Sequence, residues 1–106
     1  MIASQDEMRY LLMAALASRL HEGETLDDTS FVLPNGQRGI SCVLSRNGVP
    51  KMHHVCIGFV VLWEDRVIRV ARTIDADVTS RDFDIYQGPA PVADVILDVL
   101  RTGKPL

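Results

Sequence analysis

The fold of this chain is decided by the apolar run Val55-Cys56-Ile57-Gly58-Phe59-Val60-Val61-Leu62-Trp63, which the charged residues 64–66 bring to an end. Its β-branched and aromatic residues, bounded by charge, are typical of a buried central strand. The run is too short to cross a bilayer, which requires about 20 apolar residues. We therefore expect a sheet packed around this strand and no membrane segment.

Length and composition indicate one ordinary folded domain. The 106 residues, of which 47% are hydrophobic and 24% charged, predict a single domain over residues 1–106. The 14 acidic and 11 basic residues give a net charge of −3, which opposes general attraction to nucleic acid. Two cysteines are too few for a disulfide scaffold and are compatible with a reducing compartment, so we expect a cytoplasmic protein. Asp6 and Glu7 stand where a secretory signal carries positive charge, which favours a helix there instead.

Apolar residues at helical spacing predict one helix at each end of the chain. The first, over about residues 5–22, has Ser4 as its N-cap and Gly23 as its stop signal. The second begins near Pro91 and ends at Gly103. Their apolar stripes comprise Met8, Leu11, Leu12, Ala15, Leu16 and Leu20 in the first helix, and Val92, Val95, Ile96, Val99 and Leu100 in the second.

The residues between the helices predict an antiparallel meander. Two Asn-Gly pairs, at residues 35–36 and 47–48, indicate tight hairpin turns. The expected strands are 31–33, 40–45, the run ending at Trp63, 66–74 and a short edge strand over 83–86, whereas 24–30 and 75–84 are expected to be a loop and a polar connector. Residues 66–74 also fit a helical stripe, but their β-branched residues favour a strand. The predicted fold class is α+β, a four- to five-stranded antiparallel meander flanked by an N-terminal and a C-terminal helix.

The run at residues 55–63 is apolar on both faces, so it needs cover on both. Either one helix on each face of the sheet or a dimer partner over one face would provide that cover.

Cys42, His53, His54 and Cys56 are the residues best suited to chemistry. Alternation along a strand places His54 and Cys56 on one face. An odd-numbered hairpin loop would add Cys42 to that face, giving three zinc ligands or a thiol beside a base, whereas a two-residue loop puts Cys42 opposite His53. The spacing matches no known zinc or thiol-enzyme motif, and buried cysteines commonly pack as small hydrophobic residues.

Arg66, Arg69 and Arg72 are the one local concentration of positive charge and the candidate binding residues. On a strand, Arg66 and Arg72 would share a face and Arg69 would take the other. Phosphate or nucleic-acid binding would require aromatic residues beside them, and Trp63 is the single neighbour. Pairing with nearby carboxylates is the simpler interpretation.

Four aspartates, at positions 75, 77, 82 and 84, form an acidic cluster. It lacks the turn glycine and closing glutamate of an EF-hand loop, with Ser80 and Tyr86 in those places. We expect a solvated segment or a patch that attracts a basic protein.

Three functional hypotheses follow. The first is a small non-enzymatic domain of the inhibitor, immunity or accessory-subunit type, which binds a larger protein partner, forms a homodimer and needs no cofactor. The second is a thiol- or zinc-dependent enzyme using Cys42, His54 and Cys56. The third is nucleic-acid binding through Arg66, Arg69 and Arg72.

Overall fold

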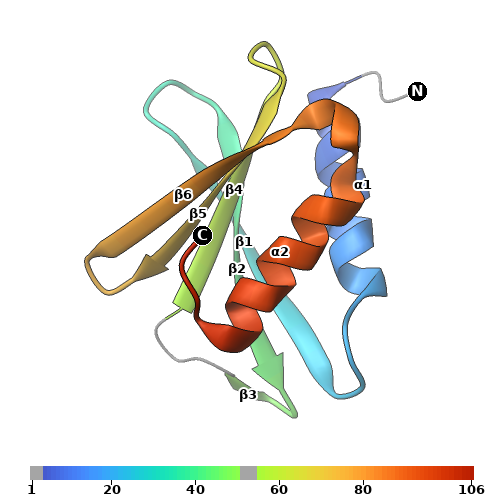
Figure 1. Cartoon of the computed structure of the whole chain (residues 1–106), viewed down its shortest axis with the longest axis vertical. Coiled ribbons are helices and arrows are strands. Elements are labelled where there is room, and N and C mark those ends of the chain that lie inside the picture. Colours follow the sequence, from blue (N-terminus) through green and yellow to red (C-terminus); the bar gives the residue numbers. More distant parts are fainter. Residues whose placement is uncertain (1–3, 51–54) are drawn as a thin grey trace.

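A computed structural model describes residues 4–50 and 55–106 and shows an α+β fold (Figure 1). In chain order the elements are α1 (Gln5–Ser18), β1 (Glu24–Val32), β2 (Arg38–Arg46), β3 (Val49–Pro50), β4 (Val55–Leu62), β5 (Val67–Ile74), β6 (Asp77–Asp84), a 3-10 turn (Ile85–Gln87) and α2 (Pro89–Thr102). The predicted fold class, an antiparallel sheet with a helix from each end of the chain, is confirmed.

The sheet is a meander in the spatial order β1-β2-β4-β5-β6, and the two-residue β3 pairs with the end of β2. All pairings are antiparallel, and β4 lies at the centre with Gly58 opposite both Ser41 of β2 and Ala71 of β5. Residues 67–74 are accordingly strand rather than helix, as their β-branched side chains predicted, and Arg66 lies in the turn before them.

Tight turns set the registers of the hairpins. Asn47 and Gly48 both have positive φ (52° and 80°), and Arg46 pairs with Val49 across them. This is the two-residue hairpin turn that Asn-Gly favours, because both residues tolerate that backbone conformation. The turn at Asn35 and Gly36 is also present, closed by the backbone bond from the Leu33 amide to the Gln37 carbonyl (2.8 Å).

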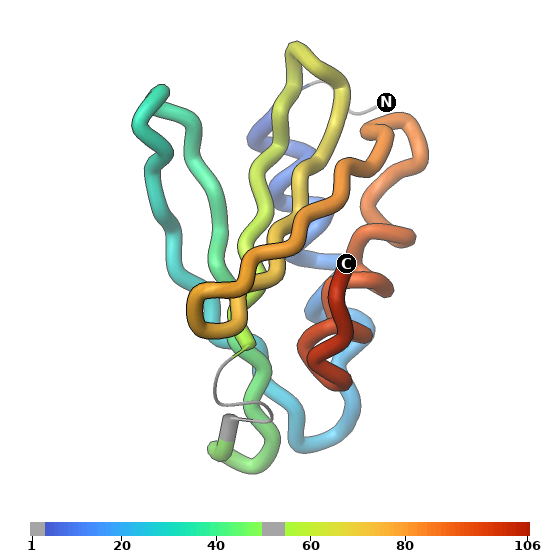
Figure 2. Tube along the Cα trace, turned by 60° about the vertical axis from the view of Figure 1, so that its left-hand side comes forward, coloured from blue at the N-terminus to red at the C-terminus, as the bar shows by residue number. Residues whose placement is uncertain are grey.

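Both helices pack side by side against the same face of the sheet (Figure 2). That face carries Val55, Ile57, Phe59 and Val61 of β4, all of which are buried. They join one hydrophobic core with the buried stripes of α1 and α2, whose members are Met8, Leu12, Leu16, Val92, Ala93, Ile96, Leu97, Val99 and Leu100. The alternative of one helix on each face is wrong.

Two segments predicted to be irregular are edge strands. Residues 24–30 form most of β1, and residues 77–84 form β6. Most side chains of both strands are exposed, so their sequences lack the apolar alternation of a half-buried strand. Backbone hydrogen bonds to β2 and β5 hold them in the sheet.

The first helix is shorter than predicted and the second begins earlier. α1 ends at Ser18 because the chain turns at Arg19, whose carbonyl oxygen accepts a hydrogen bond from Arg101 of α2 (3.1 Å). Gly23, expected to end that helix, instead lies just before β1, where its carbonyl accepts from the Asn47 amide (2.8 Å). α2 begins at Pro89 and ends as predicted, with Gly103 in the left-handed conformation.

Candidate functional site

The face of the sheet turned away from both helices, here called the open face, is the first candidate for a binding surface. No helix covers it in the part of the chain that the structure describes (Figure 2). The register brings apolar and small residues of all five long strands onto it, comprising Phe31, Gly39, Val43, Cys56, Gly58, Val60, Leu62, Val67, Ala71 and Val78.

The centre of the open face is an apolar strip along β4. Cys56, Gly58, Val60 and Leu62 alternate with the core-facing residues of that strand, and none carries a polar side chain except the thiol. The Phe31 ring lies across Gly39, where an added Cβ would overlap it. A Cβ added at Gly58 would lie at ordinary van der Waals distance from the same ring. Gly39 therefore allows the aromatic ring of the edge strand to lie over β2, whereas a side chain at position 58 would still fit beside the ring.

Charge on the open face is mainly negative. Alternation in β1, β5 and β6 puts three carboxylates there, Asp27, Asp82 and Asp84, against one guanidinium, Arg69. Arg69 donates two hydrogen bonds to Asp82, at 2.8 and 3.0 Å. This pairing lowers the pKa of Asp82 and raises that of Arg69. The remaining two carboxylates leave the rim acidic.

The structure does not bring the two cysteines together. Cys42 pairs with Ile57 across β2 and β4, so its side chain points into the core while Cys56 points to the open face. The hairpin loop has two residues, which is the parity that separates Cys42 from Cys56. His53 and His54 lie outside the described residues.

Neither thiol has the surroundings of a nucleophile or a zinc ligand within the described chain. Burial raises the pKa of Cys42 to about 12, so its thiol stays protonated at neutral pH. The Cys56 sulfur lies 2.7 Å from the hydroxyl oxygen of Ser41, its cross-strand neighbour. Among residues 4–50 and 55–106, no three His, Cys, Asp or Glu side chains are grouped so that they could hold a metal ion.

Arg66, Arg69 and Arg72 lie in three different environments. Arg66 is in the β4–β5 turn with a positive φ of 58°, and its guanidinium lies 5.7 Å from the Tyr86 ring centroid. Arg69 is on the open face, and Arg72 is on the helix-covered face, only 4% exposed. The three arginines thus form no common surface. The prediction that Arg66 and Arg72 share a strand face is wrong, because Arg66 lies in the turn before β5.

Arg72 connects the sheet to the end of α2. Its guanidinium donates to the Gly103 carbonyl (2.6 Å) and to the Asp77 carboxylate (2.7 Å). A cation near the C-terminal end of a helix is favourable because carbonyl groups there lack helical partners. Arg72 is therefore engaged in holding α2 against β5 and β6.

The four aspartates predicted to form an acidic cluster are, like the three arginines, separated from one another. Asp77 pairs with Arg72, Asp82 pairs with Arg69, and Asp84 accepts a hydrogen bond from the Tyr86 amide at the start of the 3-10 turn (2.8 Å). Asp75 occupies the β5–β6 turn with φ of 51°. The aspartates on β6 thus lie on opposite faces of an edge strand rather than around one cation.

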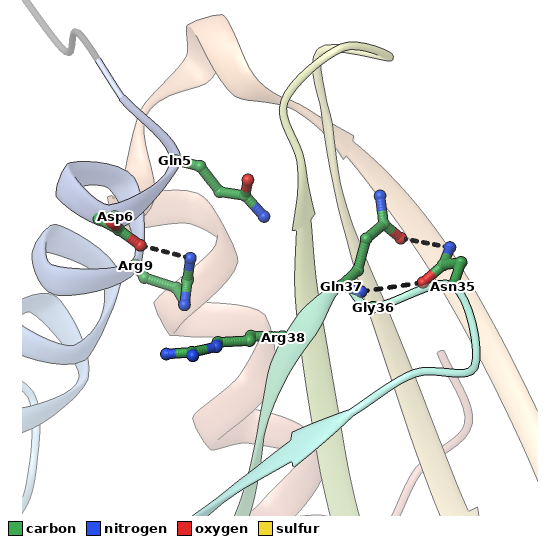
Figure 3. A pocket seen from close by; sticks show the side chains of 7 residues that line it. All are labelled: Gln5, Asp6, Arg9, Asn35, Gly36, Gln37 and Arg38. Atoms are coloured by element: carbon green, nitrogen blue, oxygen red, sulfur yellow. Dashed lines mark hydrogen bonds and ion pairs between the residues drawn. The ribbon is translucent and has the colours of Figure 1, made fainter.

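A second candidate surface, which the sequence did not predict, is a hollow between the start of α1 and the β1–β2 turn (Figure 3). Its volume is about 420 Å³. It is lined by polar and charged side chains together with one glycine, namely Gln5, Asp6, Arg9, Asn35, Gly36, Gln37 and Arg38. We call it the arginine cleft, since Arg9 and Arg38 bring their guanidinium groups into it from opposite sides.

Comparison with protein-family models, curated proteins and solved structures found no match for this chain. Among the described residues, neither helix has the length and apolar character needed to span a bilayer. The open face and the arginine cleft are therefore the two candidate binding surfaces of the described chain.

Proposed function

We propose that this protein is a non-enzymatic interaction domain that binds a protein partner through the open face. The observation that supports this is the composition of β4. An antiparallel sheet with one solvated face normally shows polar residues there. The β4 positions that face away from the helices are Cys56, Gly58, Val60 and Leu62, so this strand is apolar on both sides although the helices cover only one. Val60 and Leu62 are themselves only 8% and 7% exposed, so a partner would contact mainly the half-buried residues around them.

The acidic rim specifies the chemistry of the partner. Asp27 and Asp84 flank the apolar strip and no ion pair neutralises them among the described residues, whereas Asp82 is matched by Arg69. A partner with apolar side chains at its centre and basic residues around them complements this arrangement. A second copy of the chain would bring the same carboxylates toward one another, so we propose a different, basic protein as the occupant rather than the homodimer.

Site-specific photo-crosslinking in cells that produce the protein tests this proposal. A photo-reactive amino acid replaces Thr73, a half-buried residue of the open face, or Ser18, an exposed residue of α1 used as the control. We expect a covalent adduct with another polypeptide from position 73 and none from position 18.

Two results would overturn the proposal. An adduct of twice the chain mass at position 73 would identify the homodimer as the occupant instead. The same adducts from both positions, or none from position 73, would show that the open face is no specific docking surface. For a partner so identified, Ala71→Arg should weaken binding about tenfold or more, because a buried cation would face a basic surface.

A further inference from the structure

The arginine cleft contains more positive charge than its own residues neutralise. Arg9 pairs with Asp6 at 2.6 Å, but the Asp6 side chain is 89% exposed. Arg38 has no ion pair or hydrogen bond to any side chain among the described residues. Since guanidinium groups remain charged at all physiological pH values, the cleft holds two cations and one largely solvated carboxylate. We propose that it binds a small organic anion that carries phosphate or carboxylate groups.

The fold explains why Arg38, although exposed, extends along the α1 side of the sheet. Arg38 is the first residue of β2 and has the same parity as Ile40 and Cys42, whose side chains face the helices. Beyond the end of the core, that direction leads to the second turn of α1 and to Arg9 (Figure 3). The β1–β2 turn at Asn35 and Gly36 thus fixes where the cation lies.

Arg9 has a polar atom without a partner. Its Nε is buried and makes no hydrogen bond with residues 4–50 or 55–106, and its side chain as a whole is only 18% exposed. A buried donor left without an acceptor is unfavourable, so an acceptor placed beside this Nε would be stabilising. An oxyanion beside Arg9 and Arg38 would allow both side chains to form charge-assisted hydrogen bonds, which are the strongest that arginine makes.

Neighbouring amides restrict the shape of the cleft and add a donor. Asn35 donates to the Gln37 side-chain oxygen (2.9 Å), which orients the Gln37 carboxamide and leaves its nitrogen available. Gln5 is held by its bond to the Val61 carbonyl (2.8 Å). These side chains therefore have defined positions, which reduces the entropy lost when a ligand binds.

Size and charge indicate a metabolite-sized anion rather than a nucleic acid. A volume of about 420 Å³ is within the range of small-molecule sites, and the lining suits a hydrophilic ligand. A polyanion would meet the overall charge of −3. This inference is independent of the open face, because the two surfaces lie on opposite sides of the sheet.

An NMR titration of the isotope-labelled full chain provides the test. Inorganic phosphate and citrate are the two probes, added at constant ionic strength maintained with sodium chloride, while backbone amide shifts are followed. We expect saturable shifts at Gly36, Gln37 and Arg38. Stronger binding of phosphate would assign a phosphorylated ligand, and stronger binding of citrate would assign a polycarboxylate.

Three variants decide whether the arginine cleft is the site. Arg38→Gln should weaken binding of the preferred probe about tenfold or more. Asp6→Asn should strengthen it about threefold, because a competing carboxylate is removed from Arg9. Arg46→Gln is the matched control, since Arg46 is exposed at the opposite end of the same strand and should leave binding unchanged.

The opposite pattern would overturn the proposal. Equal weakening by Arg38→Gln and Arg46→Gln would show general screening of positive charge. Absence of saturable shifts with either probe, in a spectrum that retains the dispersion of the folded protein, would show that the cleft binds neither kind of anion.

Discussion

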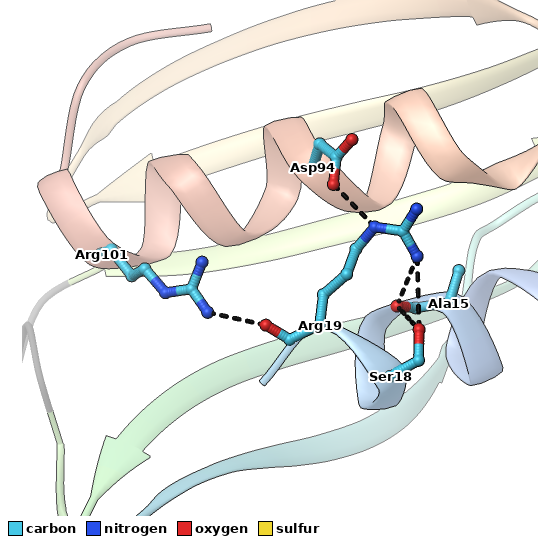
Figure 4. Close-up of polar contacts among 5 residues, drawn as sticks. All are labelled: Ala15, Ser18, Arg19, Asp94 and Arg101. Atoms are coloured by element: carbon cyan, nitrogen blue, oxygen red, sulfur yellow. Dashed lines mark hydrogen bonds and ion pairs between the residues drawn. The ribbon is translucent and has the colours of Figure 1, made fainter. Parts of the chain in front are cut away.

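The two ends of α1 each bring a pair of arginines together, but only one end supplies enough carboxylates. Beyond the C-terminal end, Arg19 pairs with Asp94 at 2.6 Å and Arg101 pairs with Glu24 at 2.7 Å. Arg19 and Arg101 both lie in the contact between α1 and α2 (Figure 4). Near the N-terminal end, Asp6 is the one carboxylate among the described residues that line the cleft with Arg9 and Arg38.

The comparison separates cations that stabilise the fold from a cation available for binding. Glu24 is the most buried carboxylate in these pairs, with 1% of its side chain exposed. It accepts two hydrogen bonds from Arg101 and one from the His21 amide (2.7 Å), so its charge is fully compensated. Arg38 makes no side-chain ion pair or hydrogen bond with the part of the chain that the structure describes. A buried charge with complete hydrogen bonding supports structure, whereas an unmatched cation in a hollow is free to bind an anion.

Removal of the charge on Glu24 should have the largest effect. Glu24→Gln leaves Arg101 without its carboxylate at the junction of α1, β1 and α2, and should lower the free energy of unfolding by about 2 to 3 kcal/mol. Urea unfolding at neutral pH measures this difference. Glu22→Gln, two residues away and exposed, is the matched control and should change stability by less than about 0.5 kcal/mol. Equal effects of the two variants would contradict the structural role of Glu24.

Acid should remove the same stabilisation gradually. The hydrogen bonds from Arg101 hold the pKa of Glu24 at about 2, below its ordinary value of 4.5. A carboxyl group with a lowered pKa stabilises the fold above its unfolded-state pKa, so this contribution is complete above about pH 4.5 and is lost as the pH falls toward about 2. Urea unfolding across this range should show a steeper loss for the native chain than for Glu24→Gln. Parallel pH dependences of the unfolding free energy in the two proteins would contradict the lowered pKa of Glu24. The Arg69–Asp82 pair is present in both proteins, so its own pH dependence cancels.

Structural features that depend on residues close together in the chain could be predicted from the sequence, whereas contacts between distant residues could not. The apolar run at residues 55–63, the Asn-Gly turns and Gly103 act locally, so they predicted the central strand, the hairpins and the end of α2. The edge strands β1 and β6 were missed because their polar side chains do not alternate with apolar ones. Their place in the sheet comes from backbone pairing, which leaves little trace in side-chain type.

Only part of the two candidate binding surfaces could be predicted from the sequence. The double-sided apolar character of residues 55–63 predicted that both faces of the sheet need cover, from one helix on each face or from a dimer partner. Both helices instead pack on one face. The Arg101–Glu24 pair, 77 residues apart in the chain, and the arginine cleft required the tertiary structure. The sequence-based candidates Arg66, Arg69 and Arg72 were selected for proximity in the chain, which a strand disperses over two faces and a turn.

The exposed pair at the C-terminal end of α1 should contribute less than Glu24. Asp94 is 66% exposed, so solvent screens its attraction to Arg19. We expect Asp94→Asn to cost about 0.5 kcal/mol in urea unfolding at low salt, and less when sodium chloride is added. Asp98→Asn, one turn further along α2, provides the control for helix charge. A salt-independent loss as large as that of Glu24→Gln would place Asp94 in the structural core of the junction.

Neutralising Arg38 should have the smallest effect on stability. Arg38→Gln removes no ion pair among the described residues and relieves repulsion with Arg9, so the free energy of unfolding should change by no more than about 0.5 kcal/mol. Arg101→Gln, which removes the cation from a matched pair, should cost about 2 kcal/mol in the same urea experiment. If Arg38→Gln proved as costly as Arg101→Gln, the two ends of α1 would not differ in kind. The arginine cleft would then be a structural contact rather than a site held open for a ligand.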